Sequence, residues 1–490
     1  MDLLISPKFK DTFWSFTHAL WFIAKKAAFL PLGMLVVAAL FPKQWKVKFV
    51  DLNVHQLRLK DIRRAKRVWI GAMISQIDSV REIIALCNGL GKPVILGGPI
   101  LETEAWCDRF PGVSHFVIGK AEEVMPALLA DLERGCAKRV YRAPRILPIE
   151  LSPIPRYELV NPKDYGSGSV QFSLSCPYHC SYCSETVIDG RPWRCKTPRR
   201  FLDELEMLYR AGFRGAVQIC DANFCGNVVK TRQMLEELIL WQTAHGFPFR
   251  FVVEAAVVIA DDSDLMKLMV DAGIERVFLG LETDNEACLA ECGKRQNMGR
   301  DLVADVLKIL EHGLLPMSGF MTGFDNDDPA EFADRMIRFI ISSRIAVAMV
   351  GAVQAQPGTK LYERVKSRLF AEAVNNTGCG TNFVPTMDMD VLESGTRRII
   401  ETIHSWEIVQ QRICNVLEKL DISKRPPKKL QFRDINALIR AFLRIGVFGG
   451  DARRCYWKVV CTAIRNYWPA FPEAITLLIY EWHFHKSKQH

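Results

Sequence analysis

The sequence predicts an α/β protein in three parts: a doubly wound parallel sheet, a partial (β/α)6 barrel and a helical C-terminal region. Three observations support this prediction. Short apolar runs alternate with helical patterns over residues 1–145, a second series of the same kind follows over 169–365, and helical periodicity continues alone after that. Apolar runs without polar alternation are typical of parallel strands that are covered on both faces.

The first part contains four expected strands, each followed by a loop and a helix-like segment. They span 46–53, 67–74, 93–99 and 115–123. In a doubly wound, Rossmann-like sheet, ligands bind at the carboxyl ends of the strands. Gly97 and Gly98 lie at such an end, where a missing side chain lets a ligand approach the backbone, although a tight turn explains them equally well.

The most apolar stretch of the chain, residues 27–41, is interpreted as a buried helix of this first domain. It is interrupted by Pro31 and is shorter than the roughly 18–20 residues that a spanning helix needs. A membrane-inserted segment is the alternative. The N-terminus lacks a secretory signal pattern, and fifteen cysteines then indicate reduced thiols. We therefore expect a cytoplasmic protein.

Residues 146–168 are rich in proline and are expected to link the first domain to a barrel over 169–365. Six strands are expected in that barrel, with helices such as 198–211 and 230–245 between them. They span 169–176, 216–224, 249–257, 276–283, 315–324 and 347–359. In a parallel barrel the chemistry lies on the loops that follow the strands.

The C-terminal part divides into an accessory helical region, 366–422, and a basic, aromatic helical subdomain, 423–490. Residues 424–490 carry 13 Lys and Arg against 4 Asp and Glu, which equals the whole-chain net charge of +9. Interleaved aromatic residues make an anionic membrane surface a candidate partner, and a solvated basic face is the plain alternative. The chain has no nucleic-acid-binding motif, so we expect no nucleic acid partner.

Three cysteines follow the first barrel strand: Cys176, Cys180 and Cys183, spaced C-x3-C-x2-C. Random placement of fifteen cysteines produces this spacing roughly 0.014 times per chain. Thiolates prefer zinc or iron–sulfur clusters. Structural zinc usually takes four ligands, and His179 is available as the fourth. Three thiolates on a four-iron cluster instead leave one iron open for substrate or cofactor.

The segment "CPYHCSYC" resembles the CxxxCxxC signature of the radical S-adenosylmethionine (SAM) superfamily, including the aromatic Tyr182 before the last cysteine. The resemblance implies that Cys176, Cys180 and Cys183 bind a [4Fe–4S] cluster whose open iron chelates SAM. Reductive cleavage of SAM then yields a 5′-deoxyadenosyl radical. An electron donor such as flavodoxin or ferredoxin is implied as a partner.

The likeness extends along the chain. Residues 1–145 resemble the cobalamin (B12)-binding domain of one subgroup, with "VILGGP" and "VIGKAEEVMPALLADL" in place of its glycine loop and its acidic loop-to-helix segment. Residues 381–404 resemble a region of the branch with hopanoid methylases and archaeal tetraether-lipid ring synthases. None of the ten histidines lies in a D-x-H-x-x-G motif. We expect cobalamin without a histidine from that motif on the cobalt; a domain that has lost cobalamin binding is the alternative.

Further candidate contacts lie at the strand ends. Asp221 and Asn223 end the second barrel strand, where a carboxylate accepts from the ammonium group of SAM or caps a turn. Glu254 and Glu282 each end an apolar strand, where an acid is costly unless it is paired. The resemblance implies that both contact SAM, and a structural salt bridge is the alternative. The last candidates are Gly319 and Gly323, which are expected near adenine or in ordinary turns.

The expected function is cobalamin-dependent methylation of an unactivated carbon on a lipid or isoprenoid substrate. Radical carbon–carbon bond formation, cyclisation or oxidoreduction without methyl transfer is the alternative within enzymes. An iron–sulfur sensor without turnover is the alternative outside them. The expected location is the cytoplasm, with peripheral contact at the inner membrane face through the C-terminal region. No residue is assigned as catalytic.

Overall fold

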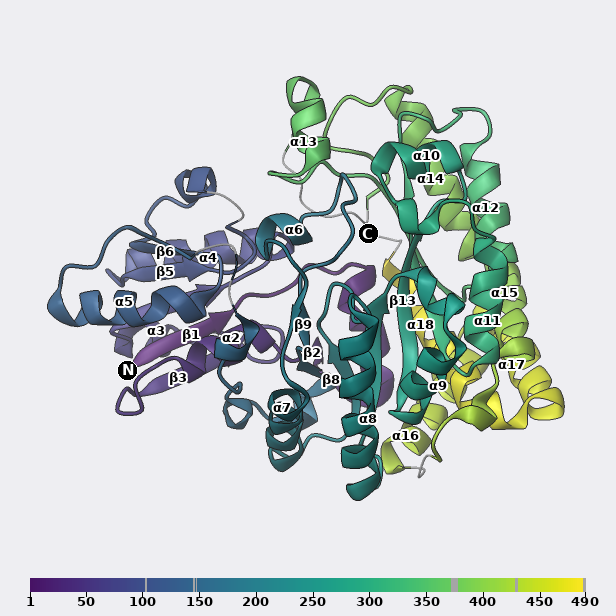
Figure 1. Ribbon diagram of the computed structural model, residues 1–490, viewed down its shortest axis with the longest axis horizontal. Helices are drawn as coiled ribbons and strands as arrows, with labels where there is room; N and C mark the ends of the chain where they lie inside the picture. Colours follow the sequence, from purple (N-terminus) through teal and green to yellow (C-terminus); the bar gives the residue numbers. More distant parts are fainter. Residues whose placement is uncertain (102–103, 144–145, 147, 372–377, 428–430, 488–490) are drawn as a thin grey trace.

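The computed structural model describes residues 1–101, 104–143, 146, 148–371, 378–427 and 431–487, and it contains two parallel sheets beside a helical layer (Figure 1). The smaller sheet has the strand order β3-β1-β4-β5-β6-β7. Its strands are β1 (Asp2–Ser6), β3 (Val47–Asp51), β4 (Arg67–Gly71), β5 (Val94–Gly97), β6 (His115–Ile118) and β7 (Val140–Arg142). All neighbours in it are parallel.

Helices cover both faces of the smaller sheet. One apolar core forms on the side of α3 (Leu59–Arg64) and α4 (Ile77–Gly89), and a second forms on the side of α2 (Leu32–Ala39) and α5 (Ala121–Arg134). The doubly wound prediction is therefore confirmed. The sequence reading missed β1 and β7; β1 lies in the interior of the sheet and all five of its residues are buried.

Residues 27–41 are not a single buried helix, and that part of the prediction is wrong. They form a short strand, β2 (Ala27–Phe29), followed by helix α2. Pro31 separates the two, because proline disfavours a helical conformation for the residue before it and is tolerated at the start of a helix. Strand β2 pairs with β8 of the larger sheet, so the N-terminal region supplies an edge strand to the barrel.

The larger sheet is an open half-barrel with the strand order β15-β14-β13-β12-β11-β8-β2, and every pair is parallel. Its other strands are β8 (Tyr165–Val170), β11 (Gly215–Ile219), β12 (Phe249–Ala255), β13 (Ile274–Glu282), β14 (Leu315–Thr322) and β15 (Val347–Ala352). All six expected barrel strands form. Strand β8 begins at Tyr165, so the last residues of the expected linker belong to the sheet.

Helices connect these strands on the outside of the half-barrel (Figure 1). They are α7 (Pro198–Arg210), α8 (Val228–Ala244), α9 (Ser263–Asp271), α10 (Glu286–Cys292), α11 (Leu302–Glu311) and α12 (Phe332–Ser342). The short helix α6 (Glu185–Ile188) follows the cysteine segment, and α13 (Lys360–Val365) follows the last strand.

The C-terminal region is helical, as predicted. It contains α14 (Met389–Ile403), α15 (Trp406–Lys419), α16 (Phe432–Ala441), a π-helix (Phe442–Val447), α17 (Ala452–Asn466) and α18 (Phe471–Ser487). Helix α18 contacts both strand β15 and the N-terminal helix α1 (Thr17–Leu20), so it lies along the open side of the half-barrel. Every helix in the described part of the chain is too short or too polar to cross a bilayer.

Candidate functional site

The three cysteines lie on the loop after the first strand of the half-barrel, at the carboxyl end of the sheet. The short strand β9 (Ser173–Leu174) leads into this loop and pairs with β10 (Arg194–Cys195). All three thiols are partly exposed, and all fifteen cysteines of the chain are free. Burial raises the pKa of the Cys183 thiol to about 12, with smaller contributions from Glu185 and from the Cys180 and Cys176 thiols. The three sulfurs are therefore close enough to interact electrostatically.

The donor set fits an iron–sulfur cluster better than a single zinc ion. Ligands of one tetrahedral zinc lie within about 4 Å of one another. Among the described residues, no three ligand atoms from the cysteines and His179 all come within 4.8 Å of each other. Side-chain amides point at two of the sulfurs: Asn223 Nδ2 lies 3.9 Å from Cys176 Sγ, and Gln296 Nε2 lies 3.7 Å from Cys180 Sγ. Such hydrogen bonds to ligating sulfurs tune clusters of this kind.

Asp221 holds the strand that carries the cysteine loop. Its Oδ1 accepts a 2.9 Å hydrogen bond from the backbone N–H of Phe172, and its Oδ2 accepts a 2.6 Å bond from the Ser173 hydroxyl. Asp221 is buried, and burial raises the pKa of its carboxyl group to about 6. Since both oxygens are occupied, the structure gives this residue a positioning role beside the predicted cofactor.

Asn223 lies two residues further on and is also buried. Its backbone carbonyl accepts from Trp193 Nε1 at 3.0 Å, which fixes the turn after β11. Its side-chain Oδ1 finds no donor among the residues that the structure describes. A buried acceptor without a partner costs about 1–3 kcal/mol. The arrangement therefore suits a ligand that brings an N–H donor next to Cys176.

Glu254 is the last residue but one of strand β12, and its side chain is solvent-accessible although many protein atoms lie around its carboxyl group. Loss of hydration by these surrounding atoms raises the pKa of the Glu254 carboxyl group to about 8. Repulsion by the Glu185 and Asp221 carboxylates adds to the rise. Dehydration also raises the pKa of Glu185 to about 7. Three acidic groups thus converge at one end of the sheet, where a cationic ligand would relieve their mutual repulsion.

Glu282 forms a salt bridge in the structure. Its Oε1 lies 2.7 Å from Lys294 Nζ, and both residues are buried. The same ammonium group lies 3.3 Å from the Tyr182 hydroxyl, next to Cys183. Glu282 has a φ of 62°, an uncommon conformation for a residue other than glycine. The pair joins the end of β13 to the cysteine loop.

The four predicted glycines lie in two places. Gly319 on β14 faces the ring of Phe278, and a Cβ there would make ordinary contact at 3.5 Å. Gly323 follows β14 with a φ of 89°, and its N–H donates to Asp327. Gly97 ends strand β5 in the other sheet and Gly98 follows it; a Cβ at Gly98 would lie 2.7 Å from the Ala72 carbonyl oxygen. Close packing of strand ends is thus sufficient to require glycine at position 98.

An ion pair connects the two sheets beside the cysteine loop. Lys120 follows β6 of the smaller sheet, and its Nζ lies 2.8 Å from Asp189 Oδ1, directly after α6. The carboxyl edge of the smaller sheet therefore adjoins the cysteine loop. Sequence reasoning missed Glu185, Asp189, Trp193 and Gln296. None of these four residues ends a predicted strand or belongs to a motif, so the sequence carries no local signal for them.

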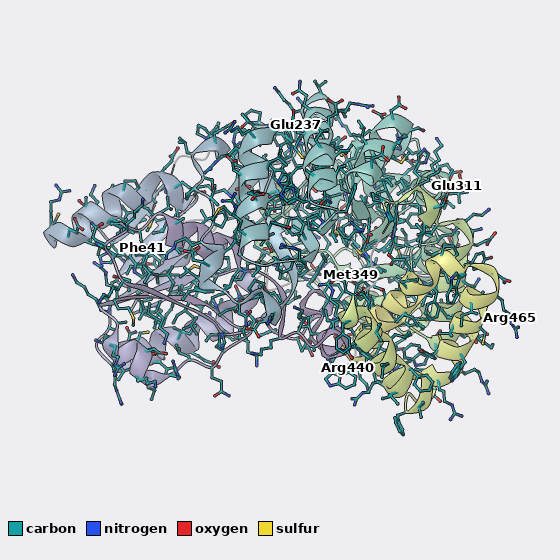
Figure 2. All side chains as sticks on the ribbon, turned by 90° about the horizontal axis from the view of Figure 1, so that it is seen from below. Phe41, Glu237, Glu311, Met349, Arg440 and Arg465 are labelled. Carbon is teal, nitrogen blue, oxygen red and sulfur yellow. The ribbon has the colours of Figure 1, made fainter. Side chains whose placement is uncertain are left out.

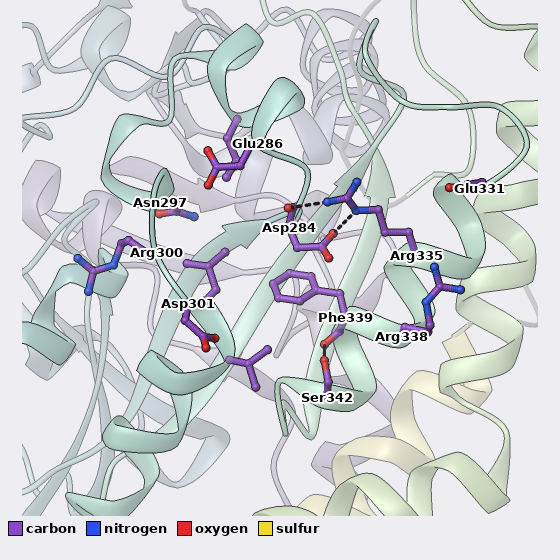
Figure 3. Close-up of a pocket in the computed structure, with 13 residues that line it drawn as sticks. Asp284, Glu286, Asn297, Arg300, Asp301, Glu331, Arg335, Arg338, Phe339 and Ser342 are labelled. Carbon is purple, nitrogen blue, oxygen red and sulfur yellow. Dashed lines mark hydrogen bonds and ion pairs between the residues drawn. The ribbon is translucent and has the colours of Figure 1, made fainter.

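A cavity of about 600 Å³ lies between the segment that follows β13 and helices α11 and α12 (Figure 3). Residues of α11 and α12 line much of it. Arg335 Nε donates a 2.9 Å hydrogen bond to Asp284 Oδ1 across the cavity. Arg300 on its rim is held by Asp261 and Asp305. Asp284 follows the carboxyl end of β13, but none of the three cysteines lines the cavity, so we assign it no part in the site.

Family models match most of the chain. They are the B12 binding domain over residues 26–129, the radical SAM superfamily over 170–337 and a domain of unknown function (DUF4070) over 359–490. An uncharacterized methyltransferase from Synechocystis sp. is 36% identical over 98% of this chain and 91% of its own length. The hopanoid C-2 methylase of Rhodopseudomonas palustris is 32% identical over 74% of this chain and 69% of its own length.

Solved structures show the same fold. The radical SAM methyltransferase TsrM from Kitasatospora setae, with cobalamin and a [4Fe–4S] cluster bound, has a TM-score of 0.63 at 14% identity and covers 94% of this chain and 99% of its own. OxsB, with aqua-cobalamin and SAM bound, has a TM-score of 0.61 at 13% identity and covers 100% of this chain and 83% of its own. The predicted [4Fe–4S], SAM and cobalamin cofactors agree with the two domains. The chain is an enzyme and belongs to the cobalamin-dependent radical SAM methyltransferase family, together with the hopanoid C-2 methylase.

Proposed function

We propose that this enzyme methylates an unactivated carbon of a lipid or isoprenoid substrate. The observation that carries the proposal is the ion pair between Lys120 and Asp189, because it joins the carboxyl edge of the B12-binding domain to the cysteine loop. The likeness to a hopanoid C-2 methylase supports a lipid substrate. When bound, the cluster and SAM supply a radical that removes hydrogen from the substrate carbon, and cobalamin supplies the methyl group.

The residues around the loop divide into ligands, contacts and supports. Cys176, Cys180 and Cys183 would hold the cluster. We infer that Asn223 Oδ1 and the Glu254 carboxylate accept hydrogen bonds from the ammonium group of SAM, since the first lacks a donor and the second lies in an acidic pocket. Neighbouring residues hold these cofactor-facing groups in fixed positions.

The support comes from residues whose polar groups are already paired. Asp221 orients the strand before Cys176, and the Glu282–Lys294 pair braces Tyr182. A preorganised shell of this kind keeps reacting groups aligned without a cost at the moment of reaction. We do not count Glu282 among the direct SAM contacts that the resemblance implies, because Lys294 occupies its carboxylate.

For the domain division we propose units close to 1–145, 165–365, 366–422 and 423–490, with a linker over 146–164 in place of the expected 146–168. Residues 13–29 pack with the half-barrel, although they precede most of the smaller sheet. Flavodoxin or ferredoxin is the proposed class of electron donor. We also propose a cytoplasmic location with contact at the membrane surface.

Anaerobic reconstitution tests this function. The protein is loaded with iron, sulfide and hydroxocobalamin, and iron and cobalt are measured per chain. It is then incubated with a chemical reductant, SAM labelled with deuterium in the methyl group, and a lipid extract. A lipid that gains a labelled methyl group, together with 5′-deoxyadenosine, is expected. The Cys183→Ala variant is the control and should give neither product.

Three results contradict the proposal. Iron without cobalt would remove the methyl donor and favour cyclisation or oxidoreduction. Formation of 5′-deoxyadenosine with full cobalt but without label in any lipid would exclude the lipid substrate class in the extract. Absence of iron would remove the radical chemistry altogether.

A further inference from the structure

Helix α16 presents its large apolar side chains to solvent. Phe432, Ile435, Ile439 and Phe442 are exposed by 77%, 41%, 49% and 40%, and they recur every three or four residues on one helix face. The buried residues at the end of α16 and in the π-helix that follows, such as Ala441, are small or aliphatic. A surface helix normally turns its apolar stripe toward the core. The stripe on α16 therefore faces away from this chain.

Neighbouring segments extend the stripe into a patch. The ring of Phe442 lies 5.9 Å from that of Trp457 on α17, and α16 packs against the short helix Trp21–Ile23 near the N-terminus. Trp21 is 49% exposed. We call this patch the docking face; its apolar members are Trp21, Phe432, Ile435, Ile439, Phe442, Leu443, Phe448 and Trp457. Contiguous exposed apolar surface of this kind marks an interaction site.

Arginines are interleaved with these apolar residues. Arg440 and Arg444 lie over the ring of Trp21, at 5.2 and 5.6 Å from its centroid. Figure 2, which views the molecule from below, shows Arg440 where the C-terminal helices meet the N-terminal segment and Arg465 at their outer edge. The docking face is thus apolar at its centre and cationic around it.

The acidic residues of this region do not neutralise that charge. Residues 424–490 contain four of them. Glu473 is buried against Arg276 and Arg425, and Glu481 is buried against His404 and Arg412. Asp434 and Asp451 remain as the acids near the surface. The net positive field is therefore available to an anionic partner.

The docking face lies at the opposite end of the half-barrel from the cysteines. The Arg433 side chain donates to the carbonyl of Arg214, just before β11, at 2.9 Å. The Arg250 side chain, at the start of β12, donates to the carbonyl of Pro427 at 3.2 Å. Helix α16 therefore covers the amino ends of the strands, below them in Figure 1. A partner bound there leaves the cysteine loop open to the water on the far side.

We propose that the docking face binds the surface of an anionic lipid bilayer. Aromatic and aliphatic side chains enter the interfacial layer, while arginines pair with lipid phosphates; this combination is typical of helices that lie in the membrane interface. Each basic residue near such a surface strengthens binding by roughly 5-fold. The purpose of this membrane binding rests on the proposed lipid substrate. The test of membrane binding does not require turnover.

Vesicle flotation with the full-length, reconstituted protein tests the proposal. Vesicles of phosphatidylcholine with phosphatidylglycerol are compared with vesicles of phosphatidylcholine alone. The wild type is expected to float with the anionic vesicles at least 10-fold better, and high salt should release it. The triple variant Phe432→Ser, Ile439→Ser and Phe448→Ser should lose at least 10-fold of this binding. The double variant Arg440→Gln and Arg444→Gln should weaken it and flatten its salt dependence.

A matched triple variant on other surfaces controls for general hydrophobicity. Leu151→Ser, Val229→Ser and Leu240→Ser remove side chains exposed by 62%, 65% and 66%, and binding should not change. Thermal melts confirm that each variant is folded. Cys183→Ala should float like the wild type, so vesicle binding and the proposed reaction can fail separately.

Three results overturn the docking proposal. They are failure of the wild type to float with either vesicle, equal binding to neutral and anionic vesicles, and full binding by the docking-face triple variant. Sedimentation velocity identifies the competing occupant. A wild-type dimer that the triple variant converts to a monomer, without vesicle binding, would assign the face to a second copy of the chain.

Discussion

Asp221 and Ser173 share a 2.6 Å hydrogen bond that ties the end of strand β11 to the chain three residues before Cys176. The same carboxylate accepts from the Phe172 backbone. Two residues after Asp221, the Asn223 amide reaches Cys176 itself. The cysteine loop is thus positioned by the neighbouring strand rather than by its own residues alone.

The variant Asp221→Ala should therefore lose cluster occupancy. It leaves the Ser173 hydroxyl and the Phe172 N–H without their acceptor, at a cost of about 1–3 kcal/mol for each unpaired group. We expect several-fold less iron per chain after anaerobic reconstitution and a lower melting temperature. Asp203→Ala, at an exposed position of α7, is the control. Wild-type iron content in Asp221→Ala would show that the loop holds its shape unaided.

The proposed contact between Glu254 and SAM predicts that SAM binding depends on pH. With a pKa of about 8 it is mostly protonated at neutral pH, and pairing with an ammonium group requires the carboxylate. Binding should therefore release a proton from Glu254, and affinity should rise by up to about 10-fold per pH unit between pH 6 and 7.5. Free α-amino groups have a pKa of about 7.7–8.0, so the amino group of SAM is mostly charged over this range and the rise in affinity should flatten toward about pH 7.5.

Calorimetry in buffers of different ionisation enthalpy measures this proton release. Glu254→Gln should abolish both the release and the pH slope, whereas Glu237→Gln on the exposed side of α8 should keep them. If Glu254→Gln released as many protons as the wild type, another group would be responsible.

The sequence predicted the parts of this molecule that depend on local patterns. Val- and Ile-rich runs marked the barrel strands, and the spacing of Cys176, Cys180 and Cys183 marked the loop. Partners far apart in the chain were not predictable. Lys294 neutralises Glu282 only because the segment after α10 folds back over the end of β13. Likewise, the composition of residues 27–29 does not predict that they pair with β8. The paired residues Ala27 and Tyr165 are 138 positions apart in the chain.

The Glu282–Lys294 pair should be worth more to stability than a surface ion pair. Lys294→Met leaves Glu282 as an uncompensated buried charge, which typically costs about 3–5 kcal/mol. The double variant Glu282→Gln and Lys294→Met removes the charge and should recover much of that loss. Urea unfolding of the single and double variants measures the difference. If the double variant were less stable than Lys294→Met, the two side chains would act independently.

Two glycines of the B12-binding domain allow the effect of backbone strain to be measured separately from the effect of steric contact. Both Gly98 and Gly91 have positive φ values, 98° and 62°. A Cβ at Gly91 meets nothing within 4 Å, whereas one at Gly98 would lie 2.7 Å from the Ala72 carbonyl oxygen. Gly91→Ala therefore incurs only the conformational cost of about 1–2 kcal/mol.

Gly98→Ala adds overpacking of about 1–3 kcal/mol to that cost and displaces the ends of β4 and β5. Those strand ends form the ligand edge of a doubly wound sheet. We expect Gly98→Ala to lower cobalt per chain several-fold after reconstitution while iron stays near its wild-type level, because the cysteine loop belongs to the other sheet. Gly91→Ala should keep both metals. Equal cobalt in the two variants would mean that cobalamin does not depend on the β5 edge.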